Sequence, residues 1–310
     1  YIIVPKGFLP RQDTGLLIAT TEAAQSISIP KLAAMQSEMA RIVREDPAVT
    51  GVVSFVGAGT INATPNTARL TIALKPANKR AGADAVIARL RAAVNGIPGL
   101  TAYIQPVQDI QIGTRVSRTQ FQYTLVDTDA PELAAWAPKL LARLQALPIL
   151  SDVATDQQNE GLRSVVRVDR DAAMRLGVSM QAVQDALYDS FGQRQISTIF
   201  AQANQYRVVL EAPPAWQANP DSLLQLHVPG AGGAEVPLTA FATIERTVAP
   251  LVITHESQFP AVTISFNLAD GASLGQAVDA GAQAERDISL PATISGSYSG
   301  DAAEFQKSLA

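Results

Sequence analysis

The sequence has no cysteine and only two histidines, His227 and His255, among its 310 residues. Without thiols the chain has no disulfide framework, no thiolate zinc site and no cysteine nucleophile. Two histidines leave little for metal binding or for histidine-based catalysis, and neither stands beside a serine–carboxylate arrangement. We interpret both as surface or packing residues, and we expect neither a metal site nor a bound cofactor.

Positive charge is scarce as well. The chain has 24 Lys and Arg against 28 Asp and Glu, a net charge of −4, and its longest basic run is the pair Lys79-Arg80. Nucleic-acid-binding proteins carry a basic patch or stripe, so we expect no nucleic-acid partner. Hydrophobic residues make up 47% of the chain and charged residues 17%, which excludes intrinsic disorder.

A continuous apolar run is also missing. The longest stretch without a charged residue, 47–68, has 22 residues, about the length of a membrane-spanning helix. Prolines, glycines, threonines and asparagines interrupt it, so we interpret it as strand, loop and strand. Residues 1–9 have no basic segment and no cleavage site of a secretory signal. From the apolar start and the amphipathic end at 302–310 we expect a piece of a longer protein.

What the sequence does contain is one order of hydrophobic patterns that occurs twice. In residues 1–115 the order is βαββαβ, with its strands and helices at 16–22, 30–46, 49–56, 69–75, 83–94 and 101–105. In residues 116–160 and 251–310 the same order recurs at 120–126, 133–147, 150–155, 261–268, 273–288 and 293–298. Such units form ferredoxin-like sandwiches, each a four-stranded antiparallel sheet backed by two helices. We therefore predict an α+β fold with two ferredoxin-like subdomains.

The second unit is interrupted between its second and third strands by an insert, 161–250. Asp169 and Ser179 stand where two helices of the insert would begin, and each is a residue type preferred as an N-cap. Alternating patterns then predict two β-hairpins. We expect the second hairpin to have a mobile tip made of Pro229, Gly230, Ala231, Gly232 and Gly233. The insert is predicted to be a third, smaller α+β domain.

Two short motifs suggest chemistry that their context does not support. Residues 57–60 (GAGT) resemble part of a phosphate-binding loop, but they have no third glycine and lead into a strand instead of a helix. Asp169 and Asp171 form a close acidic pair, yet both fall at the start of a helix, where capping and the helix dipole favour carboxylates. We interpret the first as a flexible connection and the second as capping. No Gly-x-Ser-x-Gly elbow occurs, and we predict no catalytic residue.

Phe121 and Tyr123 alternate on one face of the strand 120–126. Two interpretations stay open from the residues alone. The pair packs in a core against the helices of its sandwich, or, if that face of the sheet is open, it lines an apolar binding site.

Longer stretches carry a family resemblance. Residues 5–15 read PKGFLPRQDTG, residues 168–179 read VDRDAAMRLGVS, and Gly300 is followed by Phe305-Gln306. These stretches resemble the second large periplasmic loop of resistance-nodulation-division (RND) multidrug efflux transporters, and the resemblance covers essentially the whole chain. Within that family, five further runs resemble one subunit of a pump that combines two partner transporters: 106–110, 116–120, 191–200, 202–211 and 264–267.

The resemblance implies an architecture and a set of partners. Each βαββαβ unit would be a porter subdomain (1–115; 116–160 with 251–310), and the insert 161–250 a docking subdomain that faces a periplasmic adaptor protein and an outer-membrane channel. The parent would be a drug–proton antiporter of the inner membrane of a Gram-negative bacterium, trimeric, with this chain on its periplasmic side. Its substrates would be amphipathic drugs or other small molecules. Its proton-relay residues would lie on membrane helices outside this sequence.

The resemblance also implies site residues. The family's drug-pocket aromatics fall at Phe121 and Tyr123, which favours the binding-site interpretation of that pair. The family's glycine-rich switch loop falls at Gly57, Ala58, Gly59, Thr60, Ile61 and Asn62. Ala58 and Thr60 replace phenylalanines of well-known members, so we expect this loop to bind aromatic drugs less strongly.

Three other functions remain as alternatives at this stage. A soluble periplasmic solute-binding protein would share the pocket but act alone. A hydrolase using Asp169 or Asp171 would hold those carboxyls in a cleft with raised pKa values. An RND relative that moves proteins or lipids would share the architecture but fits the quoted runs less well.

Overall fold

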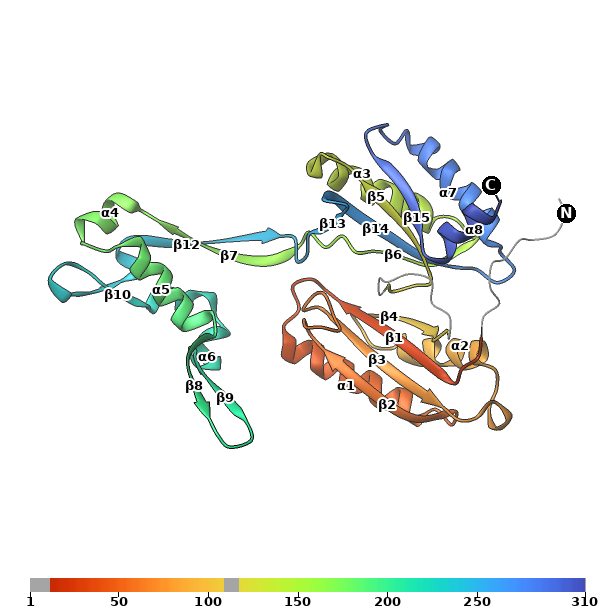
Figure 1. The fold of residues 1–310 in the computed structure, drawn as a ribbon, viewed down its shortest axis with the longest axis horizontal. Coiled ribbons are helices and arrows are strands. Elements are labelled where there is room, and N and C mark those ends of the chain that lie inside the picture. Colours follow the sequence, from red (N-terminus) through yellow and green to blue (C-terminus); the bar gives the residue numbers. More distant parts are fainter. Residues whose placement is uncertain (1–11, 109–116, 310) are drawn as a thin grey trace. The chain divides into compact units, whose positions relative to one another are not determined.

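The computed structural model of the chain describes residues 12–108 and 117–309 (Figure 1). Some of the residues that carry the family resemblance, namely 5–11, 109–110 and 116, lie outside the described residues. Across the described ranges, no helix is both long enough and apolar enough to cross a membrane. The chain divides into two compact units, of which the larger joins both ends of the chain and the smaller comprises Leu162–Ala249.

The larger unit, Tyr1–Gly161 with Pro250–Ala310, contains two sandwiches of the same topology. The first has an antiparallel sheet in the order β2-β3-β1-β4, with α1 and α2 on one face (Figure 1). Its elements are β1 (Leu16–Ala23), α1 (Ile29–Glu45), β2 (Val49–Val56), β3 (Thr67–Leu74), the short helix η1 (Ala77–Lys79), α2 (Ala83–Val94) and β4 (Leu100–Pro106). Its core joins Leu17 and Leu70 of the sheet to Met39 of α1 and Leu90 of α2.

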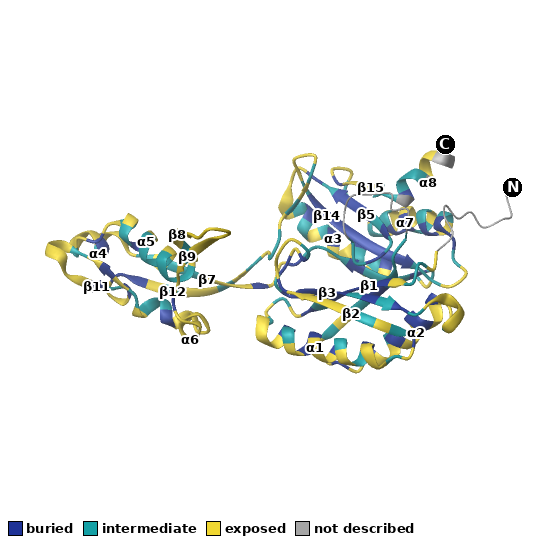
Figure 2. Cartoon of the chain, turned by 60° about the horizontal axis from the view of Figure 1, so that its bottom comes forward, coloured by how far each residue is buried: buried dark blue, intermediate teal, exposed yellow. Residues whose placement is uncertain are grey.

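The second sandwich has the order β6-β14-β5-β15, again antiparallel, with the short β13 pairing with the same strand β14. Its elements are β5 (Phe121–Val126), α3 (Ala130–Gln145), β6 (Leu150–Thr155), β13 (Thr254–Glu256), β14 (Phe259–Leu268), α7 (Leu274–Ile288), β15 (Ser295–Ser299) and α8 (Asp301–Leu309). Both sheets have the order of a ferredoxin-like sandwich, so the predicted α+β fold class is confirmed. Figure 2 shows the outward face of α1 exposed and much of the strands buried.

The smaller unit is built around its own core, in which Val183 of α5 meets Leu238 and Phe241. The two-stranded ribbon β7–β12 belongs to it, and β12 is an element that the sequence pattern did not predict. Its elements are β7 (Gly161–Val168), α4 (Arg170–Arg175), α5 (Met180–Phe191), β8 (Arg194–Phe200), β9 (Gln205–Leu210), α6 (Pro214–Gln217), η2 (Pro220–Gln225), β10 (His227–Pro229), η3 (Ala231–Gly233), β11 (Glu235–Pro237), η4 (Leu238–Ala240) and β12 (Ala242–Ala249).

A glycine in the second sandwich makes room for a buried tyrosine. Tyr123 of β5 lies across from Tyr298 of β15, with ring centroids 4.6 Å apart, and its Oη donates a hydrogen bond to Glu285 of α7. A Cβ added to Gly296 would overlap the Tyr123 Oη and Cζ. Glycine inside a strand often marks such a close approach.

We predict that Gly296→Ala destabilises the chain by about 1–3 kcal/mol, the usual cost of overpacking. Alanine is otherwise more favourable than glycine in a strand, so a loss of stability would come from overlap of the added Cβ with Tyr123. Gly51→Ala in β2 is the matched control, because nothing lies within 4 Å of its added Cβ. The measurement is urea unfolding of both variants. Equal midpoints for Gly296→Ala and the parent chain would contradict the packing described.

Candidate functional site

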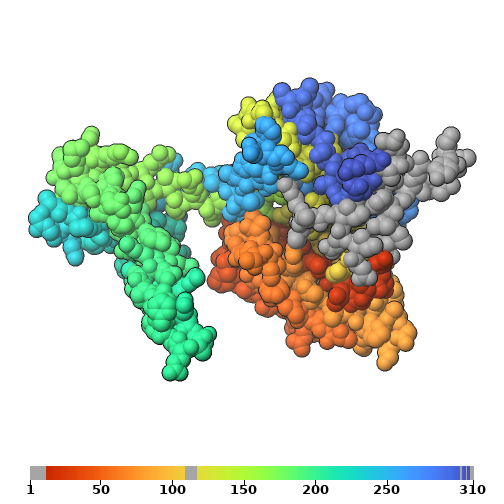
Figure 3. All heavy atoms as spheres, viewed as in Figure 1, coloured from red at the N-terminus to blue at the C-terminus, as the bar shows by residue number. Residues whose placement is uncertain are grey.

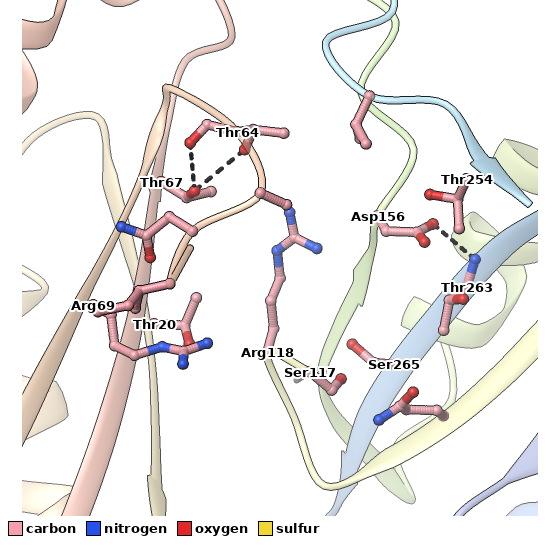
Figure 4. Close-up of a pocket in the computed structure, with 15 residues that line it drawn as sticks. Thr20, Thr64, Thr67, Arg69, Ser117, Arg118, Asp156, Thr254, Thr263 and Ser265 are labelled. Carbon is pink, nitrogen blue, oxygen red and sulfur yellow. Dashed lines mark hydrogen bonds between the residues drawn. The ribbon is translucent and has the colours of Figure 1, made fainter. Parts of the chain in front are cut away.

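A cavity of about 340 Å³ lies in the larger unit between the two sandwiches (Figure 4). It is bounded by the sheet faces that carry no helices, and most of its lining side chains are hydroxyls, amides or charged groups. The lining residues are Thr20, Ile61, Asn62, Ala63, Thr64, Thr67, Arg69, Ser117, Arg118, Gln122, Asp156, Val252, Thr254, Thr263 and Ser265.

The strand period explains why one wall of the cavity is polar. Successive side chains of a strand point to opposite faces. In the first sheet Thr20 of β1 is the cross-strand partner of Arg69 in β3, and both line the cavity. Their neighbours Ala19 and Leu70 are fully buried on the helix side. One alternation therefore supplies both the core and this wall.

The opposite wall follows the same rule. Thr263 and Ser265 of β14 line the cavity, and the residue between them, Ile264, is fully buried in the core. Thr263 is the cross-strand partner of Thr124, whose hydroxyl lies 3.3 Å from that of Thr263. Figure 4 shows Arg69 and Thr20 on one wall, with Thr263 and Ser265 on the other.

Among the residues that the structure describes, two ion pairs connect the sandwiches. The Arg118 Nε donates to Glu22 Oε2 at 2.6 Å, and Gln158 donates to the other oxygen of Glu22, also at 2.6 Å. The second pair joins Arg91 of α2 to Asp152 of β6 at 2.6 Å. All four charged side chains are partly accessible to solvent. A fully exposed pair is worth only about 0–1 kcal/mol. Arg91–Asp152 is closer to that case than the more buried Arg118–Glu22 pair, so we expect the contact near Arg91 to rearrange more easily.

The Arg69 guanidinium has no such partner. Among the described residues it makes no ion pair, and its Nε is a buried donor without a hydrogen-bond partner. Burial lowers the pKa of Arg69, the direction expected where no anion offsets the loss of hydration. The hydroxyl of Thr20, its cross-strand partner, is likewise buried without a hydrogen bond. This wall therefore presents an uncompensated positive charge and a spare hydroxyl.

Asp156 on the opposite wall is a partly buried carboxyl. Burial raises its pKa, although a hydrogen bond from the Thr263 backbone N–H (2.7 Å) and the charge of Arg118 act in the other direction. Asp156 lies just beyond the end of β6, and no pattern in the sequence marked it. Arg69 was not among the predicted site residues either. The available signal for Arg69 was a charged residue between Ala68 and Leu70 in an otherwise apolar and threonine-rich strand.

The structure corrects the placement of Phe121 and Tyr123. Their exposed fractions are 7% and 9%, and both belong to the core that the sheet shares with α3 and α7. The Phe121 ring packs against Phe266, with centroids 5.8 Å apart. Their alternation was correctly recognised, but their face is the one that the helices cover. The residue between them, Gln122, lines the cavity instead.

The loop Gly57–Asn62 lies partly at the cavity. Its last two residues, Ile61 and Asn62, are lining residues, while Ala58, Gly59 and Thr60 are exposed. The Asn62 side chain donates to the carbonyls of Gly57 (3.0 Å) and Phe55 (3.3 Å), and the Gly59 N–H donates to the Asn62 carbonyl. Gly57 has a φ of +81°, a conformation that favours glycine. The loop is therefore closed on itself at one rim of the cavity.

The base of the hairpin tip at 229–233, which the sequence predicts to be mobile, is hydrogen-bonded to its surroundings in the smaller unit. The Ala231 N–H donates to the Leu176 carbonyl at 3.0 Å, and the Gly230 N–H to the Ala234 carbonyl at 2.8 Å. A Cβ on Gly177 would lie 2.6 Å from the Ala231 Cβ. The tip thus packs on the turn between α4 and α5, while Gly232 and Gly233 at its end remain exposed.

The other candidate residues have structural roles. The Asp169 side chain accepts hydrogen bonds at 3.0 Å from the backbone N–H groups of Asp171 and Ala172, which confirms it as the N-cap of α4. Asp171 lies in the first turn of that helix. His227 and His255 are both exposed. Within the described ranges, no group of three or more His, Asp or Glu side chains is arranged to hold a metal ion.

The chain resembles known proteins both in sequence and in fold. The model of the AcrB/AcrD/AcrF family matches residues 1–310, so the chain belongs to this family of RND efflux transporters. Two crystal forms of a heavy metal efflux pump share its fold, with TM-scores of 0.87 and 0.85, each at 22% identity over 99% of this chain. The chain spans 33% of that pump's length.

Asp156 provides a pH-dependent prediction. Because its pKa is higher in the folded than in the unfolded chain, ionisation opposes folding, and the parent chain loses stability as the pH rises through the folded-state pKa. Asparagine keeps the acceptor for the Thr263 N–H but carries no charge. We expect Asp156→Asn to raise the melting temperature at about pH 8 and to have no such effect at about pH 3.

The measurement is a series of thermal melts across this pH range. Asp270→Asn, at an exposed turn position, is the control and should give a difference that does not change in this way with pH. A stabilisation by Asp156→Asn that is as large in acid as at neutral pH would contradict the electrostatic cause.

Proposed function

We propose that this chain is the periplasmic portion of an inner-membrane RND efflux pump, a drug–proton antiporter, and that the cavity between its two sandwiches is part of the substrate path. The observation that carries the proposal is the cavity itself, a space between two separately packed cores that ion pairs and hydrogen bonds bridge. The family match over the whole chain favours a pump over a solute-binding protein that acts alone.

Alternating access supplies the mechanism. Each sandwich has its own core and moves as a rigid body, so opening the cavity breaks no core contact. The pairs Arg118–Glu22 and Arg91–Asp152 close the cavity and separate when it opens. The force for this motion comes from membrane segments of the parent protein, where proton movement would be coupled. The switch loop, Gly57–Asn62, hinges at its glycines and moves Ile61 and Asn62 at the rim.

The lining supports organic substrates. Soft metal ions bind thiolate, thioether and imidazole groups, and the fifteen lining residues include no cysteine, methionine or histidine. In contrast, hydroxyl, amide and guanidinium groups with a few apolar side chains suit amphipathic molecules that carry polar groups. We propose drugs and similar amphipathic small molecules as substrates, although the structurally similar pump is described as one for heavy metals.

Assembly with partners is proposed for the smaller unit. The hairpin β8–β9 projects from this unit (Figures 1 and 3). It exposes large apolar side chains: Ile196, Ile199, Phe200, Tyr206, Val209 and Leu210. Such a surface suits another subunit of a trimer. The tip at 229–233 would dock the adaptor protein and the outer-membrane channel, because it is both exposed at its end and held firmly at its base.

We further propose that the parent pump is a mixed one. The runs at 191–200 (FGQRQISTIF) and 202–211 (QANQYRVVLE) resemble multidrug resistance protein MdtB, which works with its partner MdtC. The first of these runs forms β8 and the second forms β9, so the resemblance is concentrated in the projecting hairpin. A partner subunit of the MdtC type would then complete the trimer.

The substrate path is testable because this chain has no cysteine. A single Gln122→Cys substitution, in a parent transporter otherwise free of cysteine, places a thiol in the cavity. We expect a bulky maleimide at this position to reduce export about tenfold or more. Each tenfold change corresponds to a free-energy difference of about 1.4 kcal/mol. Bound substrate should slow the labelling.

The measurement is efflux of a fluorescent substrate from cells, before and after labelling. Met174→Cys in α4 is the control, because Met174 is 74% exposed and lies in the smaller unit, and its labelling should leave export unchanged. If labelled Gln122→Cys exports at the unlabelled rate, the cavity does not lie on the substrate path.

A second prediction concerns docking. Ala234 is exposed beside the tip at 229–233, so Ala234→Trp adds a large side chain there without disturbing the core. We expect co-purification of the adaptor and channel with the parent transporter to fall about tenfold. Ala77→Trp, at an exposed position of η1 in the first sandwich, should have no effect. Equal recovery of partners with both variants would show that the tip is not a docking surface.

A further inference from the structure

The least satisfied group in the cavity is Arg69. Its Nε is buried without a hydrogen bond, and no described residue forms an ion pair with it. Arg69 as a whole is only partly buried, but its buried Nε has lost hydration without a compensating partner. Proteins keep such a group where a ligand supplies the missing charge, and Arg binds carboxylate, sulfonate and phosphate groups in a bidentate manner.

The nearby carboxylates of Glu22 and Asp156 do not pair with Arg69. Glu22 already accepts from both Arg118 and Gln158. Asp156 belongs to the opposite wall and accepts from the Thr263 N–H. The pKa of Arg69 shifts through burial alone, with no contribution from a nearby charge. An incoming anion would therefore meet a positive charge that no carboxylate of the described residues has neutralised.

A second group beside Arg69 completes the anion site. Thr20 is its cross-strand partner on one side, and the Thr20 Oγ1 is also buried without a hydrogen bond. The two donors share one face of the sheet, since directly opposed residues of paired strands point the same way. A single oxyanion can accept from both.

An apolar surface lies on the other side of Arg69. Phe55 in β2 is the second cross-strand partner of Arg69, and Val53 shares its face of the strand. Their exposed fractions are 42% and 55%, and both lie on β2, the edge strand of the first sheet. The surface around Arg69 is therefore itself amphipathic, with charge and hydroxyl on one side and an aromatic ring on the other.

We propose that Arg69 and Thr20 bind the oxyanion of an amphipathic organic acid, whose apolar body lies over Phe55. This names a substrate class for the cavity and so rests on the proposed function. Arg69 is a specificity-determining residue here, because it favours anionic substrates over uncharged molecules of the same shape. Phe55 contributes to the binding of both the anionic and the uncharged molecules.

Two fluorescent compounds with one skeleton test this. 8-Anilinonaphthalene-1-sulfonate carries a sulfonate, and N-phenyl-1-naphthylamine is the same molecule without it. We compare export of both by cells carrying the full-length transporter with Arg69→Gln, Arg69→Lys or Phe55→Ala. The matched control is Arg163→Gln, because Arg163 is an exposed arginine of β7, and membrane levels of each variant are measured.

We expect Arg69→Gln to reduce export of the sulfonate about tenfold or more while export of the uncharged compound stays within about twofold, because only the sulfonate makes charge-assisted hydrogen bonds. Arg69→Lys keeps the charge without the planar fork and should retain an intermediate rate. Phe55→Ala should reduce both compounds to a similar extent. Arg163→Gln should change neither.

Other results overturn the proposal in distinguishable ways. If Arg69→Gln exports both compounds like the parent, the anion site is wrong and the proposed efflux function stands. If Arg69→Gln and Arg69→Lys lose both compounds equally at normal membrane levels, Arg69 has a structural role and the proposal also fails. If the parent transporter exports neither compound, amphipathic export through this cavity fails, and the anion proposal fails with it.

Discussion

The alternation of side chains along the strands of the larger unit is the constraint on which the rest of its structure depends. Each sheet is covered by helices on one face only, so every second residue is apolar and buried while the next faces the other sandwich. Because those facing residues are largely threonine, serine, glutamine and arginine, the two sheets do not merge into one dry core. A cavity with mostly polar lining side chains between two separately packed cores is the outcome, and the proposed alternating-access motion depends on it.

The charges between the sandwiches are consistent with that geometry. Arg118–Glu22 and Arg91–Asp152 are partly solvated pairs, and such pairs contribute little net stability. An apolar contact of the same extent would hold the sandwiches together far more firmly, since burial is worth about 25 cal/mol per Å². Weak polar contacts at the boundary and strong apolar packing within each sandwich therefore divide the unit into parts that can separate without unfolding.

Most of the fold could be predicted from the sequence because its elements are long and strongly periodic. The strand Val49–Val56 and the helix Ala83–Val94 have the bounds that the pattern indicated, and Asp169 and Ser179 cap the helices expected of them. The strand β12 was missed because its partner β7 is distant in the sequence and both strands of the ribbon are largely exposed, so neither carries a clear apolar stripe.

The site was harder to predict than the fold. An aromatic alternation such as Phe121 and Tyr123 reports that a strand has two different faces, but which face the helices cover depends on tertiary packing. The decisive signal was the partner strand, where Thr263 and Ser265 alternate with Ile264. Where apolar residues of one strand pair with apolar residues of the next, that face of the sheet belongs to the core. Where hydroxyl residues pair with hydroxyl residues, that face lines the cavity. Arg69 belongs to the second set, which a search for aromatic residues passes over.

This separation of faces also explains how one fold tolerates different side chains between its two sheets. The chain shares its fold with a heavy metal efflux pump at only 22% identity. Residues on the helix side of each sheet must fill a core, so their volume and polarity are constrained. Residues on the open side touch water or substrate, and a change from one polar group to another there leaves the packing intact. Under the proposed function, the chemistry of the substrate is therefore decided by the residues of each strand that the core does not constrain, and here those residues present hydroxyls and a guanidinium that pairs with no described carboxylate.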